Sequence, residues 1–248
     1  MVIISATVDA QKFQDYFSGC PLVHIAGTNH KVDIFHTQDK ALSSDYSIAA
    51  ARVVIHIHLG KRPGNILVFL PGEAEIKGVC DYIKMHAGTE NLDVFPLFGQ
   101  LSRDQKETAL TSVGENRRCI LSTNIAETSL TIKGIVFVVD SGLSRRMVYN
   151  PRLDMDMLDL RPISQASAKQ RTDRAGLTQD GVCYRLYSKE AFDSIMPPST
   201  EPAVLSSRLH EAAVKLIEMK HRRVIDFNWI DTPHPDSIAR AAQDLCDW

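Results

Sequence analysis

A dense run of hydroxyl and amide side chains follows an apolar segment in the middle of the sequence. Residues 122–132 read STNIAETSLTI and come directly after the strand-like residues Cys119–Leu121. An α/β sheet binds its ligands at the carboxyl ends of its strands, where hydroxyls and amides can donate and accept hydrogen bonds. Connecting loops rarely carry so many polar groups over this length. We therefore interpret the run as a ligand-binding loop, with a plain polar loop as the alternative.

A second pair of hydroxyls lies near the start of the chain. Ser5-Ala6-Thr7 directly follows the apolar residues 1–4. The hydroxyls of Ser5 and Thr7 can bind a phosphate or a neighbouring loop, or they can cap the helix that Asp9 is placed to begin. Taken by themselves, these three residues favour the helix cap.

Two arginines and a glutamine fall on one predicted helix. Arg171 and Arg174 are three residues apart and share a face of that helix, and Gln170 precedes them. A guanidinium donates in a fixed fork, which suits a polyphosphate if the face lines a cleft. A solvated basic face explains the same spacing equally well. Three other basic doublets are more typical of solvated surface: Arg117-Arg118, Arg145-Arg146 and Arg222-Arg223.

Several kinds of chemistry are disfavoured by what the sequence lacks. No G-x-x-x-x-G-K-[ST] segment occurs, so the chain has no phosphate loop of the usual kind. We expect no metal site, because His56 and His58 point to different sides of a helix and the five cysteines include no close pair. The scattered cysteines suit a reducing compartment. The net charge of −2 leaves phosphate binding to local clusters, and no apolar run approaches membrane-spanning length.

Alternating strand-like and helix-like segments must position these residues. Helical segments with one apolar face separate the strands, and Ser102 with Gln105 forms a capping-box pattern for one of them. Repeated strand–helix units imply an α/β fold, a mostly parallel sheet with helices on both faces. The predicted strands are residues 1–4, 22–26, 32–36, 65–70, 94–98, 119–121 and 135–139.

The alternation changes in the second half of the chain. Leu143–Tyr149 and Met155–Leu160 can pair as a hairpin, and a helix from about Ser164 and a strand at Val182–Tyr187 follow. Prolines 197, 198 and 202 mark a boundary, after which the pattern is helical. We therefore predict a first domain over residues 1–196 and a smaller, mostly helical domain over residues 197–248.

Both ends of the chain cut into predicted elements. Residues 1–4 read as a strand with nothing before it, and a final helix from about Asp236 runs to the last residues. An apolar strand needs neighbours to pair with. We expect a fragment of a longer protein, or the product of a gene that has lost its front half, with an incomplete second domain.

Three segments, in this order, resemble motifs of the DEAH-box family of superfamily-two RNA helicases. Ser5-Ala6-Thr7 resembles motif three, residues 122–132 closely resemble motif five, and residues 162–177 resemble motif six and its approach. The likeness runs from about Met1 to Arg240, and an eleven-residue match in motif five is highly specific. The resemblance implies a second RecA-like lobe followed by the start of a winged-helix region, without the first lobe.

On the RNA side, the resemblance implies roles for four polar residues. Thr123 and Asn124 would face the RNA backbone, and Ser5 and Thr7 would couple the two lobes. The predicted hairpin over residues 143–160 resembles the element that helps to part strands. RNA is therefore an expected partner.

On the nucleotide side, the resemblance implies ATP with Mg²⁺, bound through the missing first lobe and not held tightly by this chain alone. Ser129 and Thr131 would sense the nucleotide. Gln170 would position the attacking water or the γ-phosphate, and Arg174 would be an arginine finger.

Four departures from the family pattern gather on this nucleotide side. Motif six of the family reads Q-R-x-G-R-x-G-R, but Asp173 replaces its first glycine and Leu177 its last arginine. Lys133 stands where the family has an acidic residue for the ribose. The phenylalanine that stacks on adenine falls near Ala109 or Leu110, where no aromatic residue occurs.

Two functions remain open. The chain is the second half of an ATP-driven RNA helicase, or it is a degenerate, inactive lobe that binds RNA or protein. An unrelated α/β enzyme is disfavoured by motif five. The helicase interpretation implies a first lobe upstream or in trans, an activating protein as a further possible partner, and a role in mRNA processing. Splicing-type relatives favour the nucleus over the cytoplasm.

Overall fold

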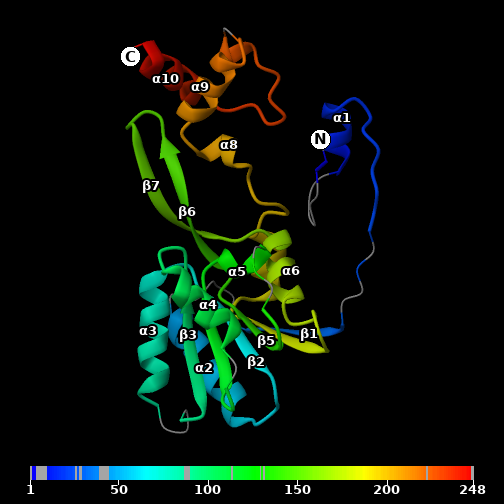
Figure 1. Cartoon of the computed structure of the whole chain (residues 1–248), viewed down its shortest axis with the longest axis vertical. Helices are drawn as coiled ribbons and strands as arrows, with labels where there is room; N and C mark the ends of the chain where they lie inside the picture. The colour runs from blue at the N-terminus through cyan, green and yellow to red at the C-terminus, as the bar shows by residue number, and fades with distance from the viewer. Residues whose placement is uncertain are drawn as a thin grey trace. The chain divides into compact units, whose positions relative to one another are not determined.

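Among the residues that the computed structural model describes, six parallel strands form the main sheet (Figure 1). The strand order is β1-β8-β5-β2-β4-β3, and every neighbouring pair runs parallel. The strands are β1 (Val32–His36), β2 (Asn65–Phe69), β3 (Leu92–Leu97), β4 (Arg117–Ser122), β5 (Ile135–Asp140) and β8 (Gly181–Arg185). The helices associated with this sheet are α2 (Tyr46–Leu59), α3 (Glu73–Lys84), α4 (Arg103–Thr111), α5 (Ile125–Thr128), α6 (Gln165–Asp173) and α7 (Lys189–Ser194).

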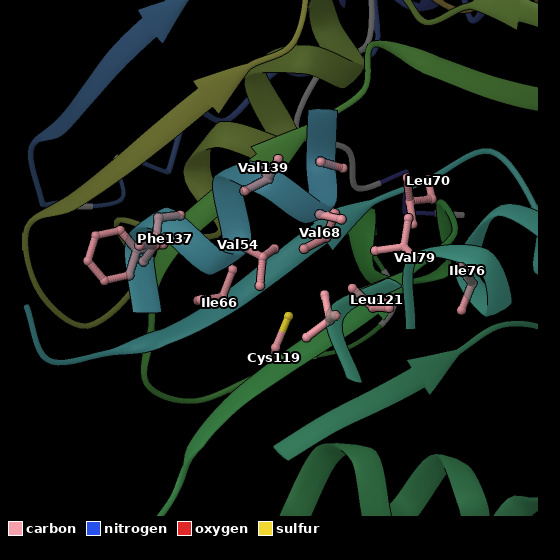
Figure 2. Close-up of a cluster of buried hydrophobic side chains, with 14 of the residues drawn as sticks. Val54, Ile66, Val68, Leu70, Ile76, Val79, Cys119, Leu121, Phe137 and Val139 are labelled. Atoms are coloured by element: carbon pink, nitrogen blue, oxygen red, sulfur yellow. The ribbon is translucent and has the colours of Figure 1, made fainter. Parts of the chain in front are cut away.

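The central strands β2, β4 and β5 are buried on both faces, and adjacent residues of each strand point to opposite sides. In β2, Ile66 and Val68 join an apolar cluster with side chains of α2 and α3, which Figure 2 shows in close-up. Leu67 and Phe69 join a second cluster that includes residues of α4 and α5. Burial on both sides explains why the central strands read as continuous apolar runs. The predicted α/β fold is confirmed.

Local sequence signals also fix where two helices begin. Ser102 caps α4, because its hydroxyl accepts from the Gln105 N–H while the Gln105 side chain accepts from the Ser102 N–H. Ser164 caps α6, where its hydroxyl accepts from the Ser167 N–H at 3.0 Å. Both predicted starts are confirmed. The second start is that of α6, the helix that carries Gln170 and Arg171.

The predicted hairpin is also confirmed, as β6 (Leu143–Asn150) paired with β7 (Met155–Pro162). Its turn contains Asp154, whose φ of 50° lies in the left-handed region. The Asp154 carboxylate pairs with Arg208 at 2.8 Å and with Arg240 at 2.9 Å, and it accepts from the Tyr149 hydroxyl at 3.1 Å. The turn is therefore tied to residues far along the chain.

The chain divides into two compact units. The sheet unit contains residues 27–145 and 160–200, and the helical unit contains residues 1–26, 146–159 and 201–248. The helical unit has its own apolar core of Leu209, Ala213, Leu216, Val224, Ile238 and Ala241. Its helices are α1 (Ala10–Tyr16), α8 (Ala203–Ser206), α9 (His210–Glu218), a short 3-10 helix (Val224–Asp226) and α10 (Pro235–Cys246). The domain boundary expected after residue 196 stays a prediction.

The structure describes residues 2–3, 10–25, 27, 30–38, 45–86, 90–112, 114–128, 130, 132–221 and 223–246. Part of the strand predicted over residues 1–4 lies outside these ranges. The strand predicted over residues 22–26 is wrong, because residues 22–25 pair with no other strand and Val23 and Ile25 are exposed. Within the described ranges, no helix is both long enough and apolar enough to cross a membrane.

Candidate functional site

The predicted ligand-binding loop starts where β4 ends, next to the carboxyl end of β3. The Thr123 N–H donates to the Leu97 carbonyl at 3.1 Å. α5 follows at once, and the Glu127 N–H donates to the Asn124 carbonyl at 2.9 Å. Thr123 is half-buried and Asn124 is exposed. Both side chains therefore lie at the edge of the sheet where α/β proteins bind ligands.

Four of the residues singled out from the sequence lie outside the described residues. They are Ser5, Thr7, Ser129 and Thr131. Their expected roles stay predictions.

Arg171 is buried in the sheet unit, with 1% of its surface exposed. Its guanidinium pairs with Asp140 at 2.7 Å and with Glu127 at 3.1 Å, and it lies 4.8 Å from the centre of the Phe69 ring. Burial opposes the charge, but the two carboxylates outweigh it and raise the Arg171 pKa. Neither interpretation of Arg171 from the sequence was right, because its donors meet carboxylates of its own chain.

Asp140, at the end of β5, organises the polar groups around Arg171. Besides Arg171, its carboxylate accepts from the Tyr187 hydroxyl at 2.9 Å and from the Gly142 N–H at 3.0 Å. Burial and the nearby carboxylate raise the pKa of Tyr187, which keeps the phenol a hydrogen-bond donor. These bonds satisfy the buried carboxylate, as a charge without solvent requires.

Arg174 follows α6 and binds the main chain of α5. Its Nε donates to the Glu127 carbonyl at 2.9 Å, Nη2 donates to the same oxygen, and Nη1 donates to the Leu130 carbonyl at 3.0 Å. Half-burial lowers the pKa of Arg174, although Glu127 and Asp173 oppose the shift. The Arg174 guanidinium is therefore bound to carbonyls and does not form a freely solvated basic surface. Gln170, which lies on α6, is half-buried.

Two of the departures from the family pattern flank Arg174. Asp173 is half-buried, and this burial raises its pKa against the opposing charges of Lys169 and Arg174. Leu177 is 40% exposed, so an apolar side chain faces solvent where the family pattern has an arginine. Neither side chain adds a cationic donor to this part of the sheet unit.

The other two departures lie elsewhere on the sheet unit. Lys133 is exposed and precedes β5, at the edge where the strands begin. Ala109 is buried in α4 and lines a shallow groove with Phe95, Pro96 and Leu101. A phenylalanine at position 109 would overpack this buried contact. The half-buried Leu110 is the more permissive neighbour.

The doublet Arg117-Arg118 was wrongly predicted to be solvated surface. Arg117 donates to the Ile57 carbonyl at 2.7 Å and to the Arg62 carbonyl, and Arg118 donates to the carbonyls of Leu110 and Lys133. Both side chains are half-buried. Such arginines satisfy carbonyls at the ends of helices and loops.

Sequence reasoning missed Asp140, Tyr187 and the anchoring role of Glu127. The available signal was Asp140 itself, a charged residue at the end of an otherwise apolar strand. A buried carboxylate needs a cation. The nearest candidate in the predicted helix pattern was Arg171, but pairing the two required a contact across 31 positions.

Comparison with known proteins gives the family of the sheet unit. Residues 49–178 match the model of the helicase conserved C-terminal domain. The chain belongs to this family.

Similarity to two solved structures narrows the family assignment to the DEAH-box branch of superfamily two. They are described as the Escherichia coli DExH-box NTPase HrpB and the Escherichia coli DEAH/RHA helicase HrpB. Each is 30% identical to this chain, with TM-scores of 0.84 and 0.85 respectively. The match covers 98% of this chain and 30% of each of those chains. The resemblance to a DEAH-box helicase C-terminal lobe is confirmed, and this lobe spans less than a third of the proteins it matches.

Proposed function

We propose that this helicase C-terminal lobe binds single-stranded RNA through Thr123 and Asn124, as the second lobe of an ATP-dependent RNA helicase. The observation that carries the proposal is the position of these side chains. They lie at the carboxyl end of β4, and Asn124 is exposed there while Thr123 is half-buried. Hydroxyl and amide groups can donate to phosphate oxygens without reading the base sequence.

The RNA contact is expected to be modest in strength. Thr123 and Asn124 are neutral, and the chain has a net charge of −2. Little of the affinity then comes from long-range attraction, so binding depends on the geometry of a few hydrogen bonds. The phosphate contribution that remains is screened by salt, and affinity falls as salt rises.

The test is a titration of a labelled single-stranded RNA with the full chain and with Thr123→Ala/Asn124→Ala. We expect the double variant to bind about fivefold more weakly, the size of one or two neutral hydrogen bonds. The matched control is Asn91→Ala/Thr111→Ala, which removes the same residue types from exposed positions, one directly before β3 and one at the last residue of α4. Equal affinity of the wild type and the Thr123/Asn124 variant would refute the proposed contact.

For nucleotide, the described residues support a limited proposal. ATP with Mg²⁺ would be bound only together with a first lobe, and Gln170 and Arg174 are the described residues expected to meet it. In this structure the Arg174 donors go to the carbonyls of Glu127 and Leu130. The residues present do not form a nucleotide site by themselves, so no catalytic step follows from them.

The second candidate is an inactive lobe that binds RNA without ATP turnover. It is favoured by the exposed Leu177 and by Asp173 next to Arg174. Leucine cannot donate to a phosphate, and a carboxylate nearby disfavours a phosphate's approach. The two candidates share the RNA contact and differ in whether a supplied first lobe restores hydrolysis. A winged helix in the helical unit and a nuclear role in mRNA processing remain proposals from family resemblance.

A further inference from the structure

Arg171 and Arg174 both bind a single residue of α5. Arg171 donates from Nε to the Glu127 carboxylate at 3.1 Å, and Arg174 donates from Nε and Nη2 to the Glu127 carbonyl. Arg174 also donates from Nη1 to the Leu130 carbonyl at 3.0 Å. The side chain and main chain of Glu127 are therefore held together by α6 and the residue that follows it. Figure 1 shows α5 and α6 close together in the sheet unit.

α5 needs such support because it has only four residues. A helix of this length is unstable by itself, since forming its first turn costs more conformational entropy than its hydrogen bonds return. A helix this short has room for few backbone bonds of its own, and two bonds tie it to the residues before it: the Glu127 N–H donates to the Asn124 carbonyl at 2.9 Å, and the Ala126 N–H donates to the Thr123 carbonyl at 3.5 Å. Contacts from outside must therefore fix its position.

Arg171 is suited to provide a fixed contact. Its guanidinium is almost fully buried, pairs with Asp140 at 2.7 Å and is packed on Phe69. A side chain held on several sides cannot follow a moving partner, so Glu127 must adopt the position that Arg171 dictates. Hydrogen bonds from a charged donor are also roughly twice as strong as neutral ones.

We propose that Arg171 and Arg174 are positioning residues that hold α5, and with it Thr123 and Asn124, in the conformation that binds RNA. The proposal rests on the proposed function and extends it to the residues that set its geometry. Neither arginine is assigned a contact with RNA. They act through Glu127, which lies three residues after Asn124.

The main test compares Arg174→Ala with Arg117→Ala, in the full chain and without nucleotide. Arg117 is the matched control, because it is a half-buried arginine that also donates to two carbonyls, but at Ile57 and Arg62. Hydrogen exchange is measured at the amides of residues 125–128. We expect about tenfold faster exchange in Arg174→Ala, given the strength of charged hydrogen bonds, and no change there in Arg117→Ala.

RNA affinity supplies a readout that a merely structural role would not move. Arg174→Ala is expected to weaken RNA binding about fivefold, as Thr123→Ala/Asn124→Ala does. Adding Arg174→Ala to Thr123→Ala/Asn124→Ala should not weaken RNA binding further, because the side chains that Arg174 positions are already gone. Additive losses would mean that Arg174 contacts RNA directly and would overturn the proposal. Arg174→Lys should recover part of both effects, since an ammonium can reach one of the carbonyls.

Glu127→Gln tests the contact between Arg171 and the Glu127 carboxylate. It also keeps the proposal testable if the Arg174→Ala protein does not fold. Glutamine keeps the length and the oxygen of the side chain but removes its charge, and Arg171 remains paired with Asp140. We expect exchange at residues 125–128 about threefold faster. Unchanged exchange in both Arg174→Ala and Glu127→Gln would overturn the proposal. If Thr123→Ala/Asn124→Ala leaves RNA affinity intact, the proposed function fails by itself, and exchange alone then decides whether the arginines hold α5.

Discussion

Arg171 pairs with two carboxylates of the sheet unit, those of Asp140 and Glu127. Its partner Asp140 is fully buried, as is Arg171 itself to within 1% of its surface. Two buried charges offset each other only if they stay paired and hydrogen-bonded. Asp140 meets this condition through Arg171, Tyr187 and Gly142. Of the two arginines singled out from the sequence, Arg171 is therefore buried and paired with carboxylates, while Arg174 is half-buried and bound to carbonyls.

This burial predicts a large stability loss for Arg171→Ala. The variant leaves Asp140 charged and without its cation, so we expect the free energy of unfolding to fall by about 3–5 kcal/mol. Arg145→Ala is the control, because it breaks a partly exposed pair with Glu75, which should cost under about 1 kcal/mol. Equilibrium urea unfolding, followed by far-UV circular dichroism, measures both. Similar losses for the two variants would contradict the role assigned to Arg171.

At the scale of elements, arginine side chains connect pieces of backbone that strand pairing leaves apart. Arg117 donates to the Ile57 carbonyl in α2 and to the Arg62 carbonyl in the loop that follows, and Arg174 binds α5. In the β6–β7 hairpin, a carboxylate of the turn makes the connection instead, and arginines are its partners. There the carboxylate of Asp154 binds Arg208 and Arg240 of the helical unit. Within that unit, Asp154 is the turn residue that pairs with both of these arginines, while Arg152 pairs with Asp236.

Asp154→Asn should therefore loosen the turn while keeping its backbone, because asparagine tolerates a positive φ well. Desolvation would raise the pKa of Asp154, but bonds from Tyr149 and Arg208 and the charge of Arg240 lower it. A lowered pKa means that the contact is complete above the ordinary carboxyl value and is lost only as pH falls through the lowered value. At pH 7 we expect about fivefold faster amide exchange in residues 148–153.

The control for the hairpin is Asp193→Asn. It removes an exposed pair with Lys189 in the sheet unit and should leave exchange in residues 148–153 unchanged. Unaltered exchange in Asp154→Asn would show that β6–β7 pairing alone holds the turn.

At the scale of the whole molecule, the lobe spans 30% of each helicase chain that it matches, and its sequence contains no phosphate loop. Whether the lobe supports hydrolysis can be tested by supplying a first lobe, for example by fusion to one from an intact relative. Asp173 and Leu177 are expected to limit such a fusion. The transition state spreads negative charge over phosphoryl oxygens, and fixed donors nearby stabilise it.

We predict that the parent fusion hydrolyses ATP slowly and that Leu177→Arg with Asp173→Gly raises kcat, by up to the roughly 10³–10⁵ attributed to an arginine finger. Only the family resemblance places position 133 at the ribose, since the structure puts Lys133 at the edge where the strands begin; a lower KM in Lys133→Asp would support that resemblance, and an unchanged KM would contradict it. Steady-state kinetics separates the two effects. A parent fusion that already matches the intact relative would rule out the inactive-lobe alternative.

The sequence by itself determined the α/β fold, the parallel strands and the place of Thr123 and Asn124, because apolar runs and capping residues are local signals. It misjudged Leu22–Ala26, where apolar type suggested a strand but no neighbouring strand pairs with the described residues. Only the tertiary structure separated Arg171 from Arg174. Arg171 lies within α6, where Asp140, Glu127 and Phe69 enclose it. Arg174 directly follows the helix and donates to the carbonyls of Glu127 and Leu130. Long-range contacts decide such burial, and a periodic pattern does not encode them.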